Sequence, residues 1–175
     1  VLYDTVRNDI ARTCEPRRSQ NPAGTIAALQ CQPDTPDVAD MAYYLMEQDD
    51  AGKVYDRRMK ANKVKSGTEV RTCANGRPSQ MWWVGGGLTA AGCYRDANKR
   101  ANLRFVSTLA ECRQLTAGST QVKNPSIYIA VLGPDRDIAS LWSWAASSTD
   151  WEAGEDLFDP IKQPGQPWSD QCPHG

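Results

Sequence analysis

The stretch Ile127-Tyr128-Ile129-Ala130-Val131-Leu132 is the clearest strand in the sequence, and the elements around it decide the fold class. An unbroken apolar run of this length, ended by Gly133-Pro134-Asp135, is typical of a buried strand. Beyond the turn, apolar residues recur at helical spacing, which predicts a helix with one face toward a core. That face comprises Ile138, Leu141, Trp142 and Ala145.

Further strands and helices are predicted on both sides of this pair of elements. Apolar or alternating runs bounded by turn residues indicate strands at 25–31, 41–46, 80–84, 88–94 and 103–107. Helices are predicted at 2–10 and at 50–64, the second with Ala51, Val54, Tyr55 and Met59 on its inner face. Runs of strands interrupted by single helices favour an α+β fold. We therefore expect an antiparallel sheet of about five or six strands with three helices.

The chain divides by composition into a body and a tail. At 19.3 kDa a single domain is expected, and residues 1–146 carry all the periodic segments. Residues 150–175 contain four prolines and no hydrophobic period, with five acids in 150–159. We expect 1–146 to form one α+β domain and 147–175 to form an extended acidic C-terminal tail.

Six cysteines are spread along the chain without the close pairs that structural zinc sites require. They are Cys14, Cys31, Cys73, Cys93, Cys112 and Cys172. Three disulfides are the preferred interpretation, and six unrelated buried thiols are the alternative. Disulfides would place the protein in an oxidising compartment, so we expect an extracellular protein, either secreted or on the outer face of a membrane-anchored one.

Charge and hydropathy exclude two classes of partner. A formal net charge of −1 and a pI of about 5.9 argue against a dedicated nucleic-acid binder. No apolar run approaches the roughly 20 residues that span a bilayer, so no membrane insertion is expected in this segment. The first residue is Val1, which suggests a processed terminus or an excised domain.

The spacing of the cysteines and aromatic residues resembles a known group of domains. The pattern runs through Cys14, Cys31, Tyr43-Tyr44, Cys73, Trp82-Trp83, Gly92-Cys93-Tyr94 and Leu141-Trp142-x-Trp144. It is similar to extracellular domains of actinobacterial-type serine/threonine kinases and related secreted proteins. The resemblance implies the pairings Cys14–Cys31 and Cys73–Cys93, and a non-catalytic role in sensing or binding.

The chain differs from this pattern at two places. Phe105-Val106-Ser107 stands where a Trp-Thr-acid strand is expected, and Cys112 and Cys172 are additional. The extra cysteines are expected to pair and so to fasten the acidic tail to the body.

Catalytic signatures are scarce. The single histidine, His174, is one residue from the end, which excludes sites that need two histidines and favours no metal or cofactor. Protein-kinase motifs are absent from the sequence, and Gly85-Gly86-Gly87 reads as a hairpin turn. A carboxylate-dependent hydrolase would need two facing acids. The candidates are Glu47, Asp49 and Asp50, or Glu152, Glu155 and Asp156, although solvated or helix-start acids explain the first group more simply.

Exposed tryptophans are the candidate binding residues. Trp82 and Trp83 are adjacent in a predicted strand and must point to opposite faces. Trp144 lies off the helix stripe, and Trp151 lies in the tail. Such side chains suit a protein partner or a cell-wall glycan, unless they pack the tail onto the body. The basic segment 53–65 and the acidic segment 150–159 could also dock, within one chain or between copies, or could simply be solvated.

The sequence therefore predicts a non-enzymatic extracellular binding, sensing or interaction module. Two alternatives remain open: a structural subunit of an extracellular assembly bridged by the tail, and a small secreted carboxylate-dependent hydrolase.

Overall fold

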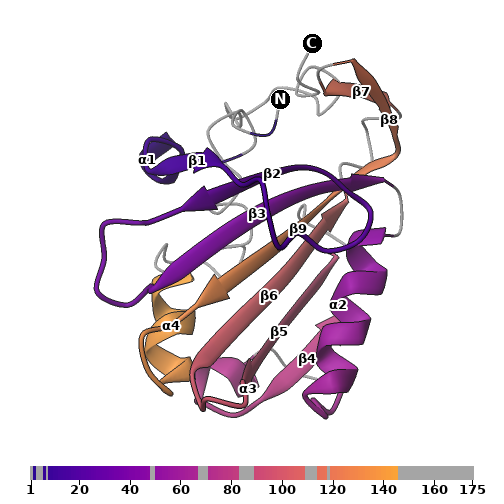
Figure 1. The fold of residues 1–175 in the computed structure, drawn as a ribbon. Coiled ribbons are helices and arrows are strands. Elements are labelled where there is room, and N and C mark those ends of the chain that lie inside the picture. The colour runs from indigo at the N-terminus through magenta and orange to yellow at the C-terminus, as the bar shows by residue number, and fades with distance from the viewer. Residues whose placement is uncertain are drawn as a thin grey trace, which may run out of the picture.

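The computed structural model describes residues 2, 6, 8–47, 50–66, 71–82, 89–108, 114–117 and 119–145. Their main feature is one antiparallel sheet of seven strands (Figure 1). In spatial order the strands are β1 (Cys14–Pro16), β2 (Thr25–Cys31), β3 (Asp40–Glu47), β9 (Pro125–Leu132), β6 (Ala101–Thr108), β5 (Ala90–Arg95) and β4 (Ser79–Trp82). A separate hairpin pairs β7 (Gln114–Ala117) with β8 (Thr120–Lys123).

The predicted strand 127–132 is the centre of the sheet, because β9 pairs with β3 on one side and with β6 on the other. Ile129 lies opposite Tyr43 of β3 and opposite Phe105 of β6. A strand that is buried on both faces and paired on both edges has to be apolar along its length. The composition of this run is therefore explained by its position.

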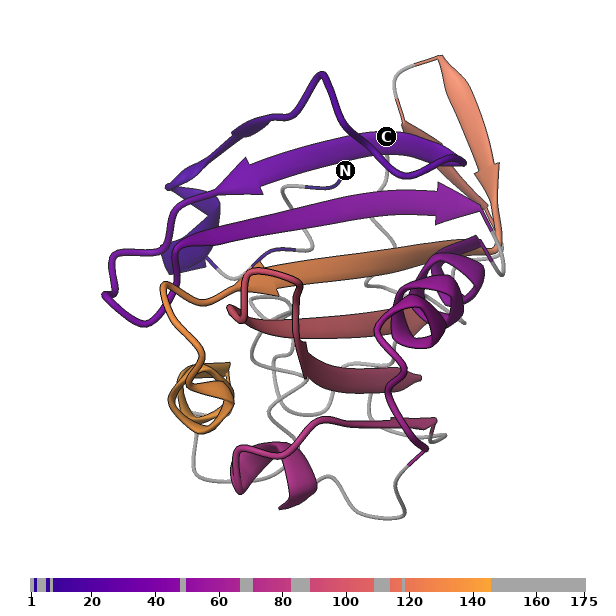
Figure 2. The same cartoon turned by 60° about the horizontal axis from the view of Figure 1, so that its bottom comes forward.

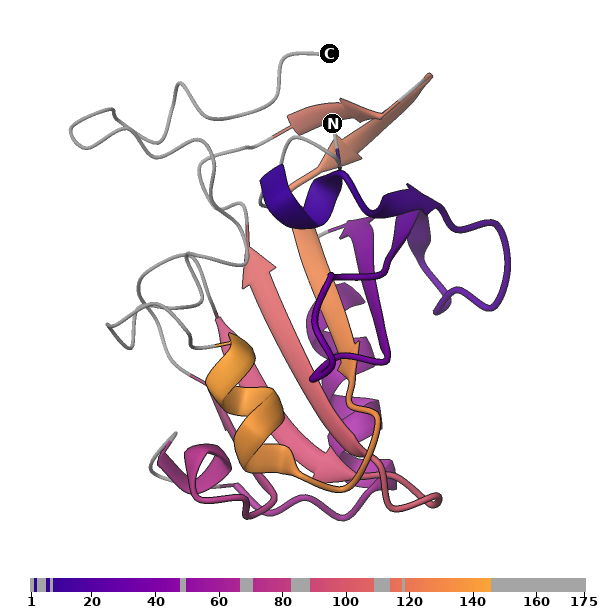
Figure 3. The same ribbon diagram turned by 90° about the vertical axis from the view of Figure 1, so that its left-hand side faces the viewer.

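In the described part of the chain, four helices accompany the sheet: α1 (Asn8–Ala11), α2 (Asp50–Ala61), α3 (Arg71–Ala74) and α4 (Ile138–Ala145). Figures 2 and 3 show α2 on one face of the sheet and α4 on the other. The predicted inner stripes of both helices are confirmed, since all four residues of each stripe are buried. Alternation along the strands separates the side chains into two apolar clusters, one under each helix.

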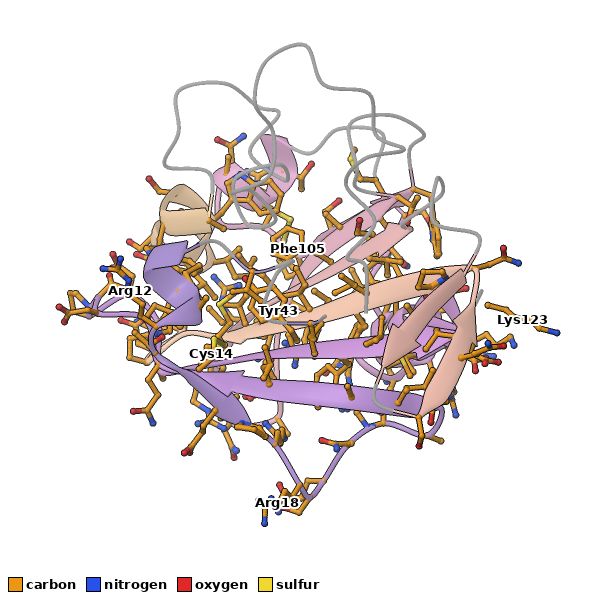
Figure 4. All side chains as sticks on the ribbon, turned by 90° about the horizontal axis from the view of Figure 1, so that it is seen from above. Arg12, Cys14, Arg18, Tyr43, Phe105 and Lys123 are labelled. Carbon is orange, nitrogen blue, oxygen red and sulfur yellow. A yellow bond between two sulfur atoms is a disulfide. The ribbon has the colours of Figure 1, made fainter. Side chains whose placement is uncertain are left out.

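Large apolar side chains fill the space between the sheet and the helices α4 and α1, and we call this side of the sheet the closed face. Tyr43, Leu103, Phe105 and Ile129 belong to this cluster, and none is more than 3% exposed. Figure 4 shows Tyr43 and Phe105 within this layer, with Cys14 at its margin. This face is the main hydrophobic core of the described residues.

The cysteine pairings implied by the resemblance are present. Cys14–Cys31 joins directly opposite residues of β1 and β2, and Cys73–Cys93 ties α3 to β5. Both cross-links lie at the closed face. The third expected pair, Cys112 and Cys172, and the predicted tail 147–175 lie outside the described residues.

The structure corrects the sequence-based fold in four respects, one of which is the hairpin of β7 and β8, for which no strands were predicted. The sheet has seven strands instead of five or six, because the segment at Cys14–Pro16, expected to be loop, pairs with β2. The N-terminal helix is described only at Asn8–Ala11, shorter than the predicted 2–10. The four-residue helix α3 was not predicted, since it lacks a full apolar period. Antiparallel α+β architecture is confirmed.

Candidate functional site

The face of the sheet that carries α2 is only half covered. Figure 2 shows α2 over one end of the strands, the right-hand end in that view. The uncovered half contains a row of aligned residues, in which Gln30, Ala42, Ala130 and Arg104 lie opposite one another on β2, β3, β9 and β6. Two neighbouring alanines between long polar side chains leave a hollow in the sheet surface.

This hollow is a pocket of about 440 Å³. That volume is within the usual range for sites that hold small molecules. The charged residues that line it are Arg17, Arg58, Arg100, Arg104, Asp40 and Asp96. Tyr44 and Tyr128 form its wall beside α2, and Asn102 and Leu132 lie at the opposite end. The pocket therefore combines a floor of two alanines and Arg104 with a charged rim in which arginines outnumber carboxylates.

Arg104 is held in place by the sheet itself. Its Nη1 donates to the carbonyl oxygens of Leu103 at 2.9 Å and Val131 at 3.1 Å, and its Nη2 donates to Asn102 Oδ1 at 2.7 Å. The guanidinium carbon also lies 5.5 Å from the ring centroid of Tyr94. Among the described residues, the buried Nε has no hydrogen-bond acceptor. Arg104 thus offers a fixed donor from the floor of the pocket.

Arg17 reaches the pocket from the opposite wall. It follows β1, so the cross-strand disulfide at Cys14 fixes the start of its loop. Its guanidinium donates to Gln30 Oε1 and lies 5.9 Å from the centroid of the Tyr44 ring. Gln30 in turn donates to Asp40. The neighbouring Arg18 is not among the pocket residues, and Figure 4 shows it extending away from the body.

Two more arginines come from separate elements. Arg58 lies on the exposed side of α2, and its guanidinium has no hydrogen bond or ion pair with another described residue. Arg100 comes from the hairpin between β5 and β6, with Nε 3.6 Å from Asp96 Oδ2. This Nε is buried and, within the described part of the chain, lacks a hydrogen-bond acceptor.

The pocket tyrosines are neutral donors at physiological pH. Burial raises the pKa of Tyr44 and Tyr128 in the pocket wall and of Tyr94 beside Arg104, and the nearby arginines only partly oppose that rise. Tyr128 is 2% exposed, and its hydroxyl has no hydrogen-bond partner among the described residues. A buried hydroxyl without a partner costs about 1–3 kcal/mol. The hydroxyl is not exposed to solvent, so a ligand in the pocket would have to displace the side chains over it to accept this hydrogen bond.

The Asp96 carboxylate accepts backbone hydrogen bonds that hold the hairpin turn at the pocket rim. Burial alone would raise its pKa, but hydrogen bonds from the Arg100 and Asn98 backbone and from the Asn102 side chain outweigh burial and lower the pKa. The backbone donors lie at 3.0 Å and 2.9 Å from Asp96 Oδ1. This carboxylate therefore stays ionised and serves as the acceptor of a tight turn.

The structure does not bring the candidate tryptophans together. Trp82 is 52% exposed at the end of β4 and meets Tyr55 edge-on, with centroids 5.3 Å apart on the α2 face. Trp144 is half-buried against the opposite cluster. Trp83 and Trp151 lie outside the described residues. Among the described tryptophans of the predicted binding surface, Trp82 is therefore the exposed one, and no other lies beside it.

The carboxylates considered for hydrolysis are not in the pocket. Asp50 pairs with Lys53 at 2.8 Å in the first turn of α2, and Glu47 is exposed at the end of β3. Asp49, Glu152, Glu155 and Asp156 lie outside the described residues. Within the described ranges, no group of three or more His, Cys, Asp or Glu residues is arranged to hold a metal ion. None of the described helices is long and apolar enough to cross a membrane.

Sequence reasoning missed this pocket because its residues belong to segments interpreted for other reasons. Arg58 was counted as one of several solvated bases on a helix, and Tyr128 as part of a core strand. One signal was available: in the run Leu103-Arg104-Phe105-Val106, strand alternation places Arg104 on the same face as the apolar Val106. A charge at such a position needs partners or a ligand.

Comparison with protein-family models, with curated proteins and with solved structures found no match. The family resemblance therefore stays a prediction, although the two disulfides that it implies are present.

Proposed function

We propose that this protein is a non-enzymatic extracellular binding module whose pocket takes a small negatively charged ligand, or the charged terminal group of a larger one. The observation that carries the proposal is the convergence of four arginines on one hollow that contains two carboxylates. Arginine is the side chain best suited to bind carboxylate and phosphate groups, because its planar fork donates two parallel hydrogen bonds.

The pocket is already organised for binding in the absence of a ligand. Arg17 and Arg104 are each placed over a tyrosine ring, and Arg104 is further held by backbone carbonyls. Fixed donors lose little conformational freedom on binding, so more of the interaction energy appears as affinity. Arg104 Nε and the Tyr128 hydroxyl are buried donors without a described partner, and they favour a ligand with several acceptor atoms that displaces the side chains covering them.

The pocket chemistry favours binding over catalysis. General acid–base catalysis at neutral pH requires a group whose pKa lies near 7. Burial keeps the tyrosines neutral, and the lowered pKa keeps Asp96 ionised. Asp40 is engaged by the Gln30 amide. Because these pocket groups keep their protonation states near neutral pH, they suit the binding of a charged ligand better than proton transfer.

The extracellular location rests on the disulfides. Two of them cross-link the described residues, and disulfides persist mainly in oxidising compartments. A secreted or surface-exposed module would meet small anions, cell-wall glycans and proteins, and the pocket is sized for the first of these or for one sugar unit of the second.

Ligand-induced changes in backbone amide NMR shifts test the proposal. Small carboxylates, phosphates and sulfates should shift the amide signals of Ala42, Tyr44, Asn102, Arg104 and Ala130, whereas neutral sugars of the same size should not. Ile138 and Leu141 of α4, which are buried on the opposite face of the sheet, are the internal controls. Saturable shifts confined to a different surface, or none with any anion, would contradict the proposed site.

A further inference from the structure

The charges around the pocket do not balance. Arg17, Arg58, Arg100 and Arg104 supply four positive charges, and Asp40 and Asp96 supply two negative ones. The described residues that line the pocket include no lysine or histidine, and histidine is the side chain whose charge ordinarily changes between pH 5 and pH 8. An anion with two negative charges would neutralise the pocket, while a single carboxylate would leave half of the excess uncompensated.

The positions of the donors favour an anion with oxygens pointing in several directions. Arg104 comes from the sheet floor, Arg58 from α2, Arg100 from the β5–β6 hairpin and Arg17 from the loop after β1. The hydroxyl of Tyr128 adds a neutral donor from the wall. A planar carboxylate engages donors near one plane, whereas the three terminal oxygens of a phosphate form a pyramid that donors can approach from several sides.

We propose that the ligand of this pocket carries a phosphomonoester, bound as its dianion by Arg58, Arg104 and Tyr128. This inference rests on the proposed binding function and names the chemical class of its ligand. The apolar floor of Ala42 and Ala130 then faces the part of the ligand that bears the phosphate.

Isothermal titration calorimetry on the full chain with glucose 6-phosphate tests the charge requirement. Three comparison ligands vary the charge: methyl glucoside phosphodiesters carry one negative charge, glucuronate carries one carboxylate, and glucose carries no charge. The second pKa of a phosphomonoester is about 6, so its dianion rises from about one tenth to nearly all of the ligand between pH 5 and pH 7.5. Affinity for glucose 6-phosphate should rise about tenfold over that range.

Inorganic sulfate is the control for protein titration, because it remains a dianion at both pH values. The charged and titratable groups that line the pocket are Arg17, Asp40, Tyr44, Arg58, Asp96, Arg100, Arg104 and Tyr128, and Tyr94 lies beside Arg104. If one of them caused the pH dependence, sulfate binding would change in parallel. A tenfold rise for sulfate as well would overturn the phosphate assignment.

Two variants on α2 distinguish binding in the pocket from nonspecific electrostatic attraction of the ligand to the helix. Arg58→Gln should weaken glucose 6-phosphate binding at least tenfold, as expected for a lost hydrogen bond between charged groups. Arg57→Gln is the matched control: it removes the same charge one residue away, but Arg57 is not in the pocket and donates to the Lys53 carbonyl. Equal losses in both variants would show diffuse electrostatic attraction and overturn the inference.

The result also separates this inference from the proposed function. Equal affinity for glucuronate, the phosphodiester and glucose 6-phosphate, abolished by Arg58→Gln, would leave an anion-binding module and reject the phosphomonoester. Absence of binding by every anion would reject both. Vesicles containing phosphatidic acid, compared with soluble glucose 6-phosphate, distinguish a lipid phosphate from a soluble one, and either source supports the inference.

Discussion

The two faces of the sheet are built from alternate residues of the same strands, yet they differ in how they are completed. On β9, Ile127, Ile129 and Val131 point to the closed face, and all three are fully buried. Their neighbours Tyr128 and Ala130 point to the face with α2, where the pocket lies. The closed face is covered by apolar and aromatic side chains along its length. On the other face the apolar cluster under α2 covers only one half, and the other half is lined by arginine, tyrosine and alanine side chains.

If the proposed binding function is right, stability and recognition are divided between the two faces of the sheet. Both disulfides and the larger apolar cluster lie on the closed side. The pocket side can therefore tolerate an unpartnered hydroxyl and an excess of positive charge, because the stability of the sheet depends mainly on the other face. Substitutions that act on one face should leave the other property largely unchanged.

The largest effect is expected from truncating the central strand on the closed face. Ile129→Ala removes a fully buried side chain and should lower the free energy of unfolding by about 2–5 kcal/mol. Ala130→Ser, at the adjacent position facing the pocket, should change it by less than about 0.5 kcal/mol. Urea denaturation of both variants measures the contrast. Similar losses for the two would show that the faces share the stability equally.

A glycine beneath α2 gives the next effect. A Cβ added at Gly92 would lie 2.7 Å from Met59 Sδ and 2.8 Å from the Tyr55 hydroxyl. Gly92→Ala should therefore cost about 1–3 kcal/mol through overpacking. Gly133→Ala is the control on the closed face, because its added Cβ would meet atoms no nearer than 3.4 Å. Thermal unfolding should show a clear loss only for Gly92→Ala.

The cap of α4 is expected to contribute less and to depend on pH. Asp137 accepts hydrogen bonds from the Ser140 backbone N–H at 3.1 Å and from its hydroxyl at 2.9 Å. Asp137→Ala should cost about 1 kcal/mol at pH 7, as for other helix N-caps. The Ser140 hydrogen bonds lower the pKa of Asp137 in the folded state. The stabilisation is therefore fully present above the unfolded pKa of about 3.9 and is lost as pH falls through the folded pKa.

The test compares Asp137→Ala with the wild type at pH 7 and at pH 3. The difference in unfolding free energy should shrink at the lower pH. Asp56→Ala, an exposed acid in α2, serves as the control and should change the free energy little at either pH. A difference for Asp137→Ala that is constant with pH would exclude the charged cap.

Tyr128→Phe is expected to have the smallest effect on the free energy of unfolding and a clear effect on anion binding. Tyr128→Phe removes a buried hydroxyl that lacks a described partner, so the free energy of unfolding should be unchanged or slightly higher. Tyr55→Phe, under α2, removes the 2.6 Å hydrogen bond to the Ala91 carbonyl and should lower stability by about 1 kcal/mol. Only Tyr128→Phe should also weaken anion binding. A stability loss at Tyr128 equal to that at Tyr55 would show that its hydroxyl is already satisfied.

Local pattern was sufficient for most of the fold. The run at 127–132, the helix stripe from Ile138 to Ala145 and the alternation at 103–107 each reflect burial along one element, and all three are present in the structure. The seventh strand, β1, was missed because its three residues are half-exposed or exposed, and its pairing depends on β2 and the disulfide. Short edge strands have little apolar pattern of their own.

The candidate site was not predictable in the same way. Tryptophans were favoured because they are rare and large, yet Trp82 and Trp144 lie on opposite faces of the sheet. The pocket residues come from five strands or loops and one helix, and none is unusual by itself. Their common location follows from strand order, which places β3, β9 and β6 side by side although they are far apart in sequence.

The sequence by itself determined the α+β class, most of the strands, the inner faces of α2 and α4, and a cysteine pattern compatible with disulfides, because each depends on spacing along one segment. The tertiary structure alone decided which polar residues meet. Antiparallel register aligned Ala42, Ala130 and Arg104, and the limited length of α2 left that row open. Contacts between distant segments depend on register and coverage, and no local pattern in the chain encodes either.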